Sequence, residues 1–321
     1  MRDPQQLINR FRNRRQVLDG GLATELEDRG HDISGKLWSG HVLLNDPKAV
    51  EQVHYDYIAA GADIITSASY QLSPLGMIEA GYDKSQAQRV LELSVELAVK
   101  ARDRCLDDGV VSDGASTPLI AASIGPYGAY LADGSEYTGD YDLDNGALYE
   151  FHQERVAVLT QTDADFIAFE TVPSLSEAMV LVELGRDYGE PPIWISFSCR
   201  DGEHLSDGTK VRDAVNAVLC GRPNLIAIGV NCTAPQYVEP ILRQFANTEA
   251  VPLVAYPNSG EGWDAVHRCW VGENGPIDFS EYAQRWIAAG ANIIGGCCRT
   301  GPAHIRQLRE LLSAGRVGGV R

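Results

Sequence analysis

The chain has 321 residues, of which 44% are hydrophobic and 22% charged, a balance typical of a globular protein with a large apolar core. Its formal net charge of −17 disfavours nucleic acid and anionic membranes as partners, because both attract basic surfaces. No stretch approaches the ~20 apolar residues of a membrane-spanning helix, and residues 1–15 lack the apolar segment of a secretory signal. Seven cysteines in such a chain favour a reduced, cytoplasmic compartment in which some thiols can bind metal.

Apolar runs alternate with amphipathic segments along nearly the whole chain. The apolar runs predict strands at 17–21, 62–70, 119–125, 166–171, 193–199, 225–232, 251–258 and 291–298. The amphipathic segments predict helices at 47–60, 84–108, 146–160, 211–220, 235–246, 279–289 and 302–313, and another after a capping box formed by Ser174 and Glu177. Long loops are expected through 37–40 and at 126–139, the second of them rich in tyrosine, glycine and acidic residues.

This alternation predicts an α/β fold with a single (β/α)8 TIM barrel that spans 1–321 as one domain. The predicted strands are almost continuously apolar, as expected when protein covers both faces of a parallel sheet. The sequence AAGADII at 59–65 returns as AAGANII at 288–294, so both mark the same helix-to-strand step of a repeating unit. A doubly wound open sheet is the alternative. It is disfavoured because no Gly-x-Gly-x-x-Gly follows the first strand and no P-loop motif is present.

Cysteines stand at the carboxyl ends of predicted strands, which is where a (β/α)8 barrel carries its functional residues. Cys297 and Cys298 are adjacent, a spacing that disfavours a disulfide between them, and Cys232 ends another strand. Three thiolates could hold one zinc ion and leave its fourth position open for a substrate, as catalytic zinc requires. Cys199 also ends a strand and could be a spare thiol near the site. The remaining cysteines are expected to be small apolar residues on helices or loops: Cys105, Cys220 and Cys269.

Two short motifs carry a resemblance to a known family. The sequences GVNC at 229–232 and GGCCR at 295–299 together resemble the paired signature of the zinc-dependent homocysteine S-methyltransferases. The segments LDGGLATELE at 18–27, TSASYQ at 66–71 and FETVP at 169–173 are similar to that family as well. The segments at 123–139 and 256–261 look most like the branch that uses S-methylmethionine or S-adenosylmethionine rather than betaine. Gly301 departs from the family pattern, which often has threonine there, and we expect it to affect only loop stiffness.

The resemblance implies an enzyme that transfers a methyl group from a sulfonium donor to homocysteine and so makes methionine. It implies one zinc ion per chain, held by Cys232, Cys297 and Cys298, which keeps the homocysteine sulfur as a thiolate. Asp19 and Glu170 would bind the substrate ammonium. Five more residues are expected to contact substrate: Tyr70, Tyr127, Asn231, Asn258 and Glu261. The acidic and aromatic side chains of 126–139 would attract the sulfonium: Tyr127, Tyr130, Tyr137, Asp133 and Glu136.

Other functions stay open at this stage. Selenocysteine or another thiol could replace homocysteine as the acceptor in the same fold. A non-catalytic zinc-binding barrel would need a closed site with four protein ligands, and Cys199 is the candidate for the fourth. A zinc hydrolase is less favoured, because hydrolytic sites rely on histidine and carboxylate ligands and the seven histidines here do not cluster in the sequence.

Overall fold

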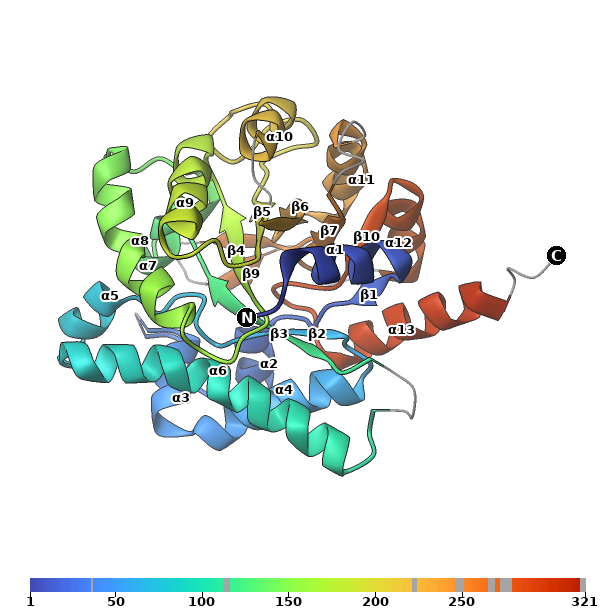
Figure 1. Ribbon diagram of the computed structural model, residues 1–321, viewed down its shortest axis with the longest axis horizontal. Coiled ribbons are helices and arrows are strands. Elements are labelled where there is room, and N and C mark those ends of the chain that lie inside the picture. Colours follow the sequence, from blue (N-terminus) through green and yellow to red (C-terminus); the bar gives the residue numbers. More distant parts are fainter. Residues whose placement is uncertain are drawn as a thin grey trace.

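Eight parallel strands form a nearly closed barrel in a computed structural model that describes residues 1–35, 37–111, 116–220, 224–245, 251–264, 269–271 and 279–317 (Figure 1). Their order in the sheet is β1-β10-β7-β6-β5-β4-β3-β2. The ring closes where Leu18, just after β1, pairs in parallel with Ile64 of β2. The strands are β1 (Gln16–Val17), β2 (Ile64–Thr66), β3 (Leu119–Ile124), β4 (Phe166–Val172), β5 (Ile193–Phe197), β6 (Leu225–Asn231), β7 (Leu253–Tyr256) and β10 (Ala291–Ile294). The TIM barrel predicted from the alternation is therefore confirmed.

Helices surround the ring of strands, and α1 lies across one end of it (Figure 1). The helices are α1 (Pro4–Asn13), α2 (Leu22–Asp28), α3 (Ser39–Asn45), α4 (Pro47–Ala59), α5 (Pro74–Glu79), α6 (Lys84–Asp107), α7 (Tyr127–Leu131), the 3-10 helix η1 (Ser135–Tyr137), α8 (Asn145–Leu159), α9 (Leu175–Asp187), α10 (Val211–Leu219), α11 (Pro235–Gln244), α12 (Phe279–Ala288) and α13 (Pro302–Val317). A two-stranded antiparallel hairpin, β8 (Gly262–Asp264) and β9 (Cys269–Val271), forms a separate sheet.

Several segments differ from the prediction. The loops expected through 37–40 and at 126–139 contain α3, α7 and η1, helices of seven, five and three residues that are too short to leave a periodic signal. Helix α1 was not predicted, although Asp3 caps it and Pro4 opens it. The capping box is only half formed: Ser174 Oγ accepts from Glu177 N at 3.2 Å, but the Glu177 carboxylate contacts His152 instead.

The barrel interior is filled from the end covered by α1 toward the opposite end. Phe11 of α1 packs edge-on against Phe166 of β4, with ring centroids 6.3 Å apart. Phe166 contacts Trp194 at 5.0 Å, and Trp194 contacts Tyr256 at 5.8 Å. The Tyr256 hydroxyl then donates to Glu170 at 3.0 Å. This aromatic column, Phe11–Phe166–Trp194–Tyr256, links the closed end of the barrel to the carboxylate near its carboxyl-terminal mouth.

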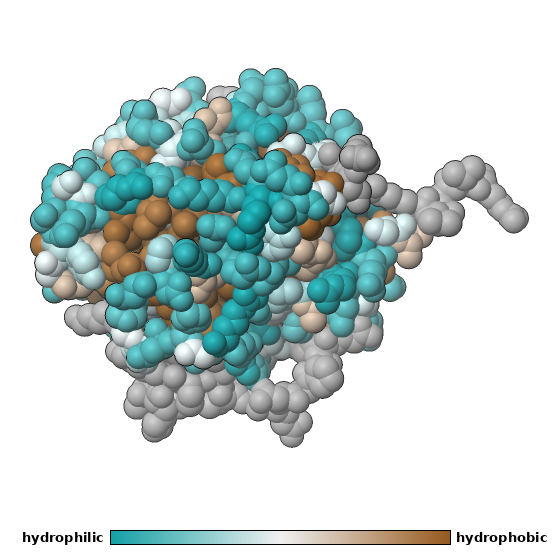
Figure 2. All heavy atoms as spheres, turned by 90° about the horizontal axis from the view of Figure 1, so that it is seen from below, coloured by the Kyte–Doolittle hydropathy of each residue, from teal (hydrophilic) through white to brown (hydrophobic). Residues whose placement is uncertain are grey.

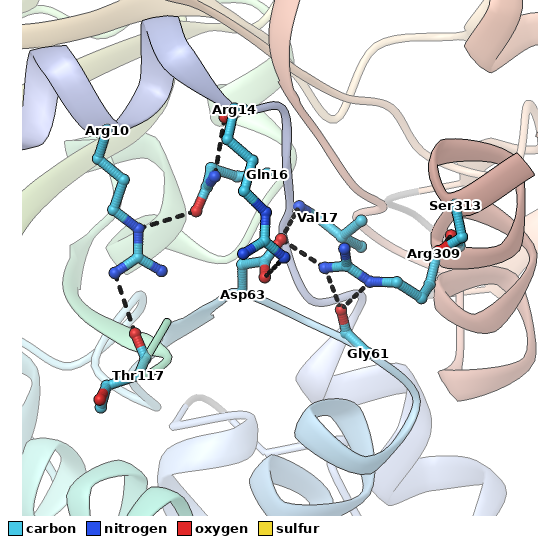
Figure 3. Close-up of polar contacts among 9 residues, drawn as sticks. All are labelled: Arg10, Arg14, Gln16, Val17, Gly61, Asp63, Thr117, Arg309 and Ser313. Carbon is cyan, nitrogen blue, oxygen red and sulfur yellow. Dashed lines mark hydrogen bonds and ion pairs between the residues drawn. The ribbon is translucent and has the colours of Figure 1, made fainter. Parts of the chain in front are cut away.

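An ion-pair network around Asp63 joins elements at the amino-terminal end of the barrel (Figure 3). The Asp63 carboxylate accepts from Val17 N at 2.9 Å, from Arg14 Nη2 at 3.3 Å and from Arg309. Arg309 also donates to Gly61 O at 2.7 and 2.9 Å. One carboxylate therefore ties α1, β1, β2 and α13 together at the point where the sheet closes.

Asp63, Asn292 and Asp165 each stand near the start of a strand and accept a hydrogen bond from the neighbouring strand. Asn292, the equivalent of Asp63 in the second copy of the repeat, accepts from Leu253 N at 2.9 Å. Asp165, just before β4, accepts from Ile120 N at 2.7 Å. In each case a side-chain oxygen at the start of one strand satisfies a backbone N–H of the neighbouring strand, which fixes their relative register.

Most of the surface in Figure 2 is hydrophilic, with hydrophobic side chains showing in patches between the hydrophilic ones. Leu75 and Ile78 of α5 are large apolar residues that are 45% and 49% exposed. Among the residues that the structure describes, no helix combines the length and apolar character needed to cross a bilayer.

Replacing Asp63 should destabilise the closed barrel. Asp63→Asn keeps the size of the side chain but leaves Arg14 and Arg309 without their buried counter-charge, so we expect the free energy of unfolding to fall by about 3 kcal/mol. Denaturant unfolding measures this change in the free energy of unfolding. Asp103→Asn, which removes only the exposed partner of Arg102, should change it by less than about 1 kcal/mol. Equal effects of the two changes would contradict the role assigned to Asp63.

His54 of α4 should make stability depend on pH. It is fully buried with neither ring nitrogen hydrogen-bonded, and burial lowers its pKa from 6.5 to about 4. Because the unfolded chain binds this proton more readily, stability is lost as pH falls from 6.5 through 4, by on the order of 3 kcal/mol. His54→Leu should therefore lose less stability than the wild type over that window in denaturant titrations. His41→Leu, at an exposed position, should keep the wild-type profile.

Candidate active site

Three cysteine sulfurs meet at the carboxyl-terminal end of the barrel. Cys232 directly follows β6, and Cys297 and Cys298 follow β10. Their Sγ atoms all lie within 4.8 Å of one another, and those of Cys232 and Cys298 are 3.6 Å apart. Among the residues that the structure describes, these three cysteines form the one group of histidine, cysteine or acidic side chains that is close enough to share a metal ion. The structure thus brings together the three ligands predicted for zinc, and a set of three sulfurs suits a soft, tetrahedral ion.

The three thiols also influence one another's protonation. Hydrogen bonds from Cys297 and Cys298 lower the pKa of Cys232 well below the usual range of a thiol. The pKa values of Cys297 and Cys298 are raised, first because each is hydrogen-bonded to Cys232 and also because a second thiolate would face the first at close range. Three thiolates can therefore coexist here only with a cation between them.

Cys199 is not part of this group. Its backbone N donates to Thr233 Oγ1 at 3.0 Å, and burial raises the pKa of its thiol. Cys105 is buried and Cys220 is exposed, both away from the cluster, while the Cys269 side chain lies outside the part of the chain that the structure describes. A fourth cysteine ligand is therefore not in place among the described cysteines.

Two buried carboxylates share a cavity with the thiols. Asp19 accepts from Thr66 N at 2.7 Å and from Thr66 Oγ1 at 3.0 Å. Glu170 accepts from Tyr256 and from the hydroxyl of Ser123. Burial raises the pKa of Asp19 well above its usual range and that of Glu170 to about 7. Neither forms an ion pair with a described lysine or arginine, so a cationic ligand would supply the charge they lack.

A second cavity adjoins this one. The first, of about 90 Å³, contains Asp19, Glu170 and the three cysteines, and the second has about 200 Å³. Six residues line both cavities and form their common wall: Thr24, Trp38, Tyr70, Glu136, Tyr137 and Cys298. The site can therefore hold two neighbouring ligands, with the sulfur cluster accessible to both.

Comparison with known proteins agrees with this geometry. The sequence profile of the homocysteine S-methyltransferase family matches residues 16–312. The chain belongs to this family. Homocysteine S-methyltransferase of Escherichia coli (strain K12) is 46% identical over 295 residues, which are 91% of this chain and 94% of the relative. Selenocysteine Se-methyltransferase of Brassica oleracea var. italica is 42% identical over 311 residues, covering 94% and 89% of the two chains.

Solved structures show the same barrel. The crystal structure of the homocysteine methyltransferase MmuM from Escherichia coli in its metallated form superposes with a TM-score of 0.84 at 42% identity, covering 96% of this chain and 99% of that chain. The oxidized form of MmuM gives the same TM-score. A methyltransferase from Methanosarcina mazei, at 11% identity and a TM-score of 0.56, shares the fold alone.

A strained turn aims one of the carboxylates in this homocysteine S-methyltransferase family member. Thr171 has φ of 59°, and the pairing of β4 with β5 shifts register between Phe169 and Val172. Asn231 holds this turn, because its Oδ1 accepts from Thr171 N and its Nδ2 donates to Thr171 Oγ1, both at 2.7 Å. Asn231 also lines the cavity, so its side chain supports the turn that follows Glu170 and faces the cavity as well.

Five residues expected to contact substrate or to attract the sulfonium do not line either cavity: Tyr127, Tyr130, Asp133, Asn258 and Glu261. The ring of Tyr127 packs against Tyr141 and Phe151, with centroids 5.3 and 4.9 Å apart, and lies in this aromatic group rather than in the wall of either cavity. Asn258 Oδ1 accepts from Gly260 N at 2.9 Å. Glu261 accepts from Arg299 Nε at 3.0 Å. The last two instead shape the loop beside Cys297, as turn residues do.

Tyr137, expected near the sulfonium, lies at the sulfur cluster, and three further residues of the site were not singled out from the sequence. The Tyr137 hydroxyl lies 3.3 Å from Cys232 Sγ, on the same loop as Tyr127. Thr66, Ser123 and Tyr256 hold the two carboxylates. Their signal in the sequence is their place at or near the ends of strands; for Thr66 this signal is hidden because the apolar run predicts β2 as far as Tyr70, whereas the strand ends at Thr66. Tyr70 nonetheless lines both cavities.

Asn231 provides a test of the strained turn. Asn231→Ala leaves Thr171 N buried without a partner, and we expect the free energy of unfolding to fall by about 2 kcal/mol. Asn9→Ala removes an exposed side-chain hydrogen bond of α1 and should change it by less than about 0.5 kcal/mol. Denaturant unfolding of the two variants compares them. A loss as small for Asn231→Ala as for the control would show that Asn231 does not support the turn.

Proposed function

We propose that this protein is a zinc-dependent homocysteine S-methyltransferase that moves a methyl group from a sulfonium donor to homocysteine and gives methionine. The observation that carries the proposal is the meeting of three cysteine sulfurs within 4.8 Å beside two buried carboxylates that have no cationic partner among the described residues. S-methylmethionine and S-adenosylmethionine are the candidate donors. Membership of the homocysteine S-methyltransferase family and the name of the Escherichia coli relative support the acceptor.

Cys232, Cys297 and Cys298 would hold the zinc ion. When bound, the ion would leave one position open for the homocysteine sulfur and would favour its deprotonated, electron-rich form at neutral pH. The cluster requires reduced thiols, which favours a cytoplasmic location for the protein.

The acidic residues position the acceptor. Asp19 and Glu170 are buried at the mouth of the barrel and would bind the homocysteine ammonium, which places its thiol near the cysteines. The homocysteine sulfur forms a bond to the methyl carbon, while the bond to the donor sulfur breaks and its electron pair stays on the neutral thioether. The methyl transfer itself needs no general base, so the contribution of these residues is orientation, which is worth about 7–11 kcal/mol in favourable cases.

Selenocysteine is a second candidate acceptor. The Brassica oleracea relative named selenocysteine Se-methyltransferase covers 94% of this chain. A selenolate would occupy the same position as the thiolate, with the ammonium on the same two carboxylates. Competition between homocysteine and selenocysteine for one methyl donor measures the preference directly.

A donor panel tests the proposed reaction. Purified protein should form methionine from homocysteine with S-methylmethionine or S-adenosylmethionine, and should give little with betaine or methyl-folate. Failure with both sulfonium donors would reject the proposal.

X-ray absorption tests the metal site. The spectrum of the zinc-loaded protein should show three sulfurs and one exchangeable light atom around zinc, whereas four protein sulfurs would support a closed, non-catalytic site.

Removing one zinc ligand should abolish the activity. Cys298→Ala leaves two sulfurs for the metal, so we expect methyl transfer to fall by more than about 100-fold, beyond the usual loss from an outer-shell residue. Zinc content by mass spectrometry should fall with it. Cys220→Ala, at an exposed position outside the cluster, should retain both the methyl transfer activity and the zinc content of the wild type. Intact methyl transfer in a zinc-loaded Cys298→Ala protein would contradict the assigned ligand.

A further inference from the structure

The second cavity adjoins the sulfur cluster and has the chemistry of a cation site. It shares Cys298 with the first cavity and is walled by the aromatic side chains of Trp38, Tyr70 and Tyr137. Glu136 is the acidic residue of the wall common to both cavities. A ligand in the second cavity therefore has aromatic faces, a carboxylate and the cluster within its reach, a combination that attracts cations.

Glu136 has an unused carboxylate oxygen. Its Oε2 is buried and has no hydrogen-bond partner. No ion pair joins Glu136 to a lysine or arginine in the ranges that the structure describes. A buried carboxylate oxygen without a partner is costly, so its position in a cavity wall points to a cationic ligand that supplies the missing interaction.

The fold holds Glu136 in this place. Its carbonyl oxygen accepts from Ser198 Oγ at 3.0 Å, which ties η1 to the end of β5. On its other side Gly128 of α7 packs so closely that a Cβ there would lie 2.3 Å from Glu136 N. The next residue, Tyr137, reaches Cys232 Sγ at 3.3 Å. The carboxylate is therefore preorganised beside the sulfur cluster rather than carried on a free loop.

Two other acidic residues of the second cavity are less suited to this role. Glu27 and Asp32 are exposed, so water screens their charge. Asp32 also accepts from Ser34 N at 2.9 Å. Glu136 differs from both because its free oxygen is removed from water.

We propose that Glu136 binds the positively charged sulfur of the methyl donor and makes the second cavity select sulfonium compounds over neutral thioethers. This inference rests on the proposed function and deepens it. When the methyl group leaves, the electron pair of the broken carbon–sulfur bond stays on the donor sulfur, which becomes neutral. The attraction to Glu136 is thus strongest before transfer and absent afterwards. Glu136 should therefore tighten donor binding without holding back the neutral product and without accelerating the chemical step.

The first experiment measures binding without turnover. S-methylmethionine and S-adenosylmethionine are titrated by calorimetry into zinc-loaded protein in the absence of homocysteine, with methionine as the uncharged thioether. Glu136→Gln should weaken binding of the sulfonium at least about tenfold, because an isosteric side chain loses a full charge in a poorly hydrated site. Methionine binding should change by less than about twofold. The sulfonium that binds more tightly to the wild type identifies the donor.

Matched variants separate charge from shape. Asp140→Asn makes the same charge change on the same loop at an exposed position outside both cavities, and should bind donor like the wild type. Glu136→Asp keeps the charge and should retain most of the preference for sulfonium. In turnover, Glu136→Gln should raise the KM for the donor without lowering kcat, while the KM for homocysteine stays within about twofold. A merely structural residue would lower kcat and zinc content as well.

The outcomes distinguish this inference from the function on which it rests. Equal binding of S-methylmethionine to the wild type and to Glu136→Gln, with normal methyl transfer by the wild type, would overturn the role of Glu136 and leave the function standing. Wild-type protein that binds sulfonium no better than methionine would overturn it too. Absence of methyl transfer from either sulfonium by the wild type would instead reject the proposed function, and the binding ratio would still decide the role of Glu136.

Discussion

The site depends on one strand, β7, which keeps two distant parts of the chain in register. Cys232 follows β6 and the cysteine pair follows β10, and β7 lies between these strands in the sheet. Cys232 N donates to Tyr256 O at 3.1 Å, and Cys297 N donates to Pro257 O at 2.8 Å. Neighbouring strands lie about 4.8 Å apart, so strands on either side of β7 are separated by about twice that distance. Their sulfurs approach only because both turns bend inward over the end of β7, and Cys232 has φ of 44° to do so.

The two ends of the barrel handle buried charge in opposite ways. At the amino-terminal end, Asp63 is surrounded by Arg14, Arg309 and a backbone N–H, so its charge is compensated within the protein. At the mouth, Asp19 and Glu170 have hydroxyl and amide donors but no described cationic side chain. Burial without a counter-charge raises the pKa of both carboxyls. Stability is thus concentrated at one end, while the carboxyls at the other end lack a counter-charge, which a cationic ligand can supply.

In this homocysteine S-methyltransferase family member, packing inside the barrel and hydrogen bonds to the surrounding loops also hold the site in place. The aromatic column Phe11–Phe166–Trp194–Tyr256 fills the barrel, and its last member donates to Glu170. Beside it, buried Arg155 donates to Tyr70 O at 2.8 Å and to Gly125 O at 3.0 Å, which holds the loops that carry the aromatic wall of the cavities. Rigid packing of this kind limits the freedom of groups that must be held in place for methyl transfer.

The sequence by itself determined the alternation of strands and helices and the strand ends that carry Asp19, Glu170, Cys232 and the cysteine pair. These follow from apolar periodicity and from the rule that parallel strands present their carboxyl ends on one side. Only the tertiary structure decided that Tyr137 rather than Tyr127 faces the sulfur, and that Glu136 keeps a free oxygen in the cavity wall. Helices as short as α7 and η1 have almost no periodic signal, and the direction of their side chains is set by contacts with residues far away in the chain, such as Ser198.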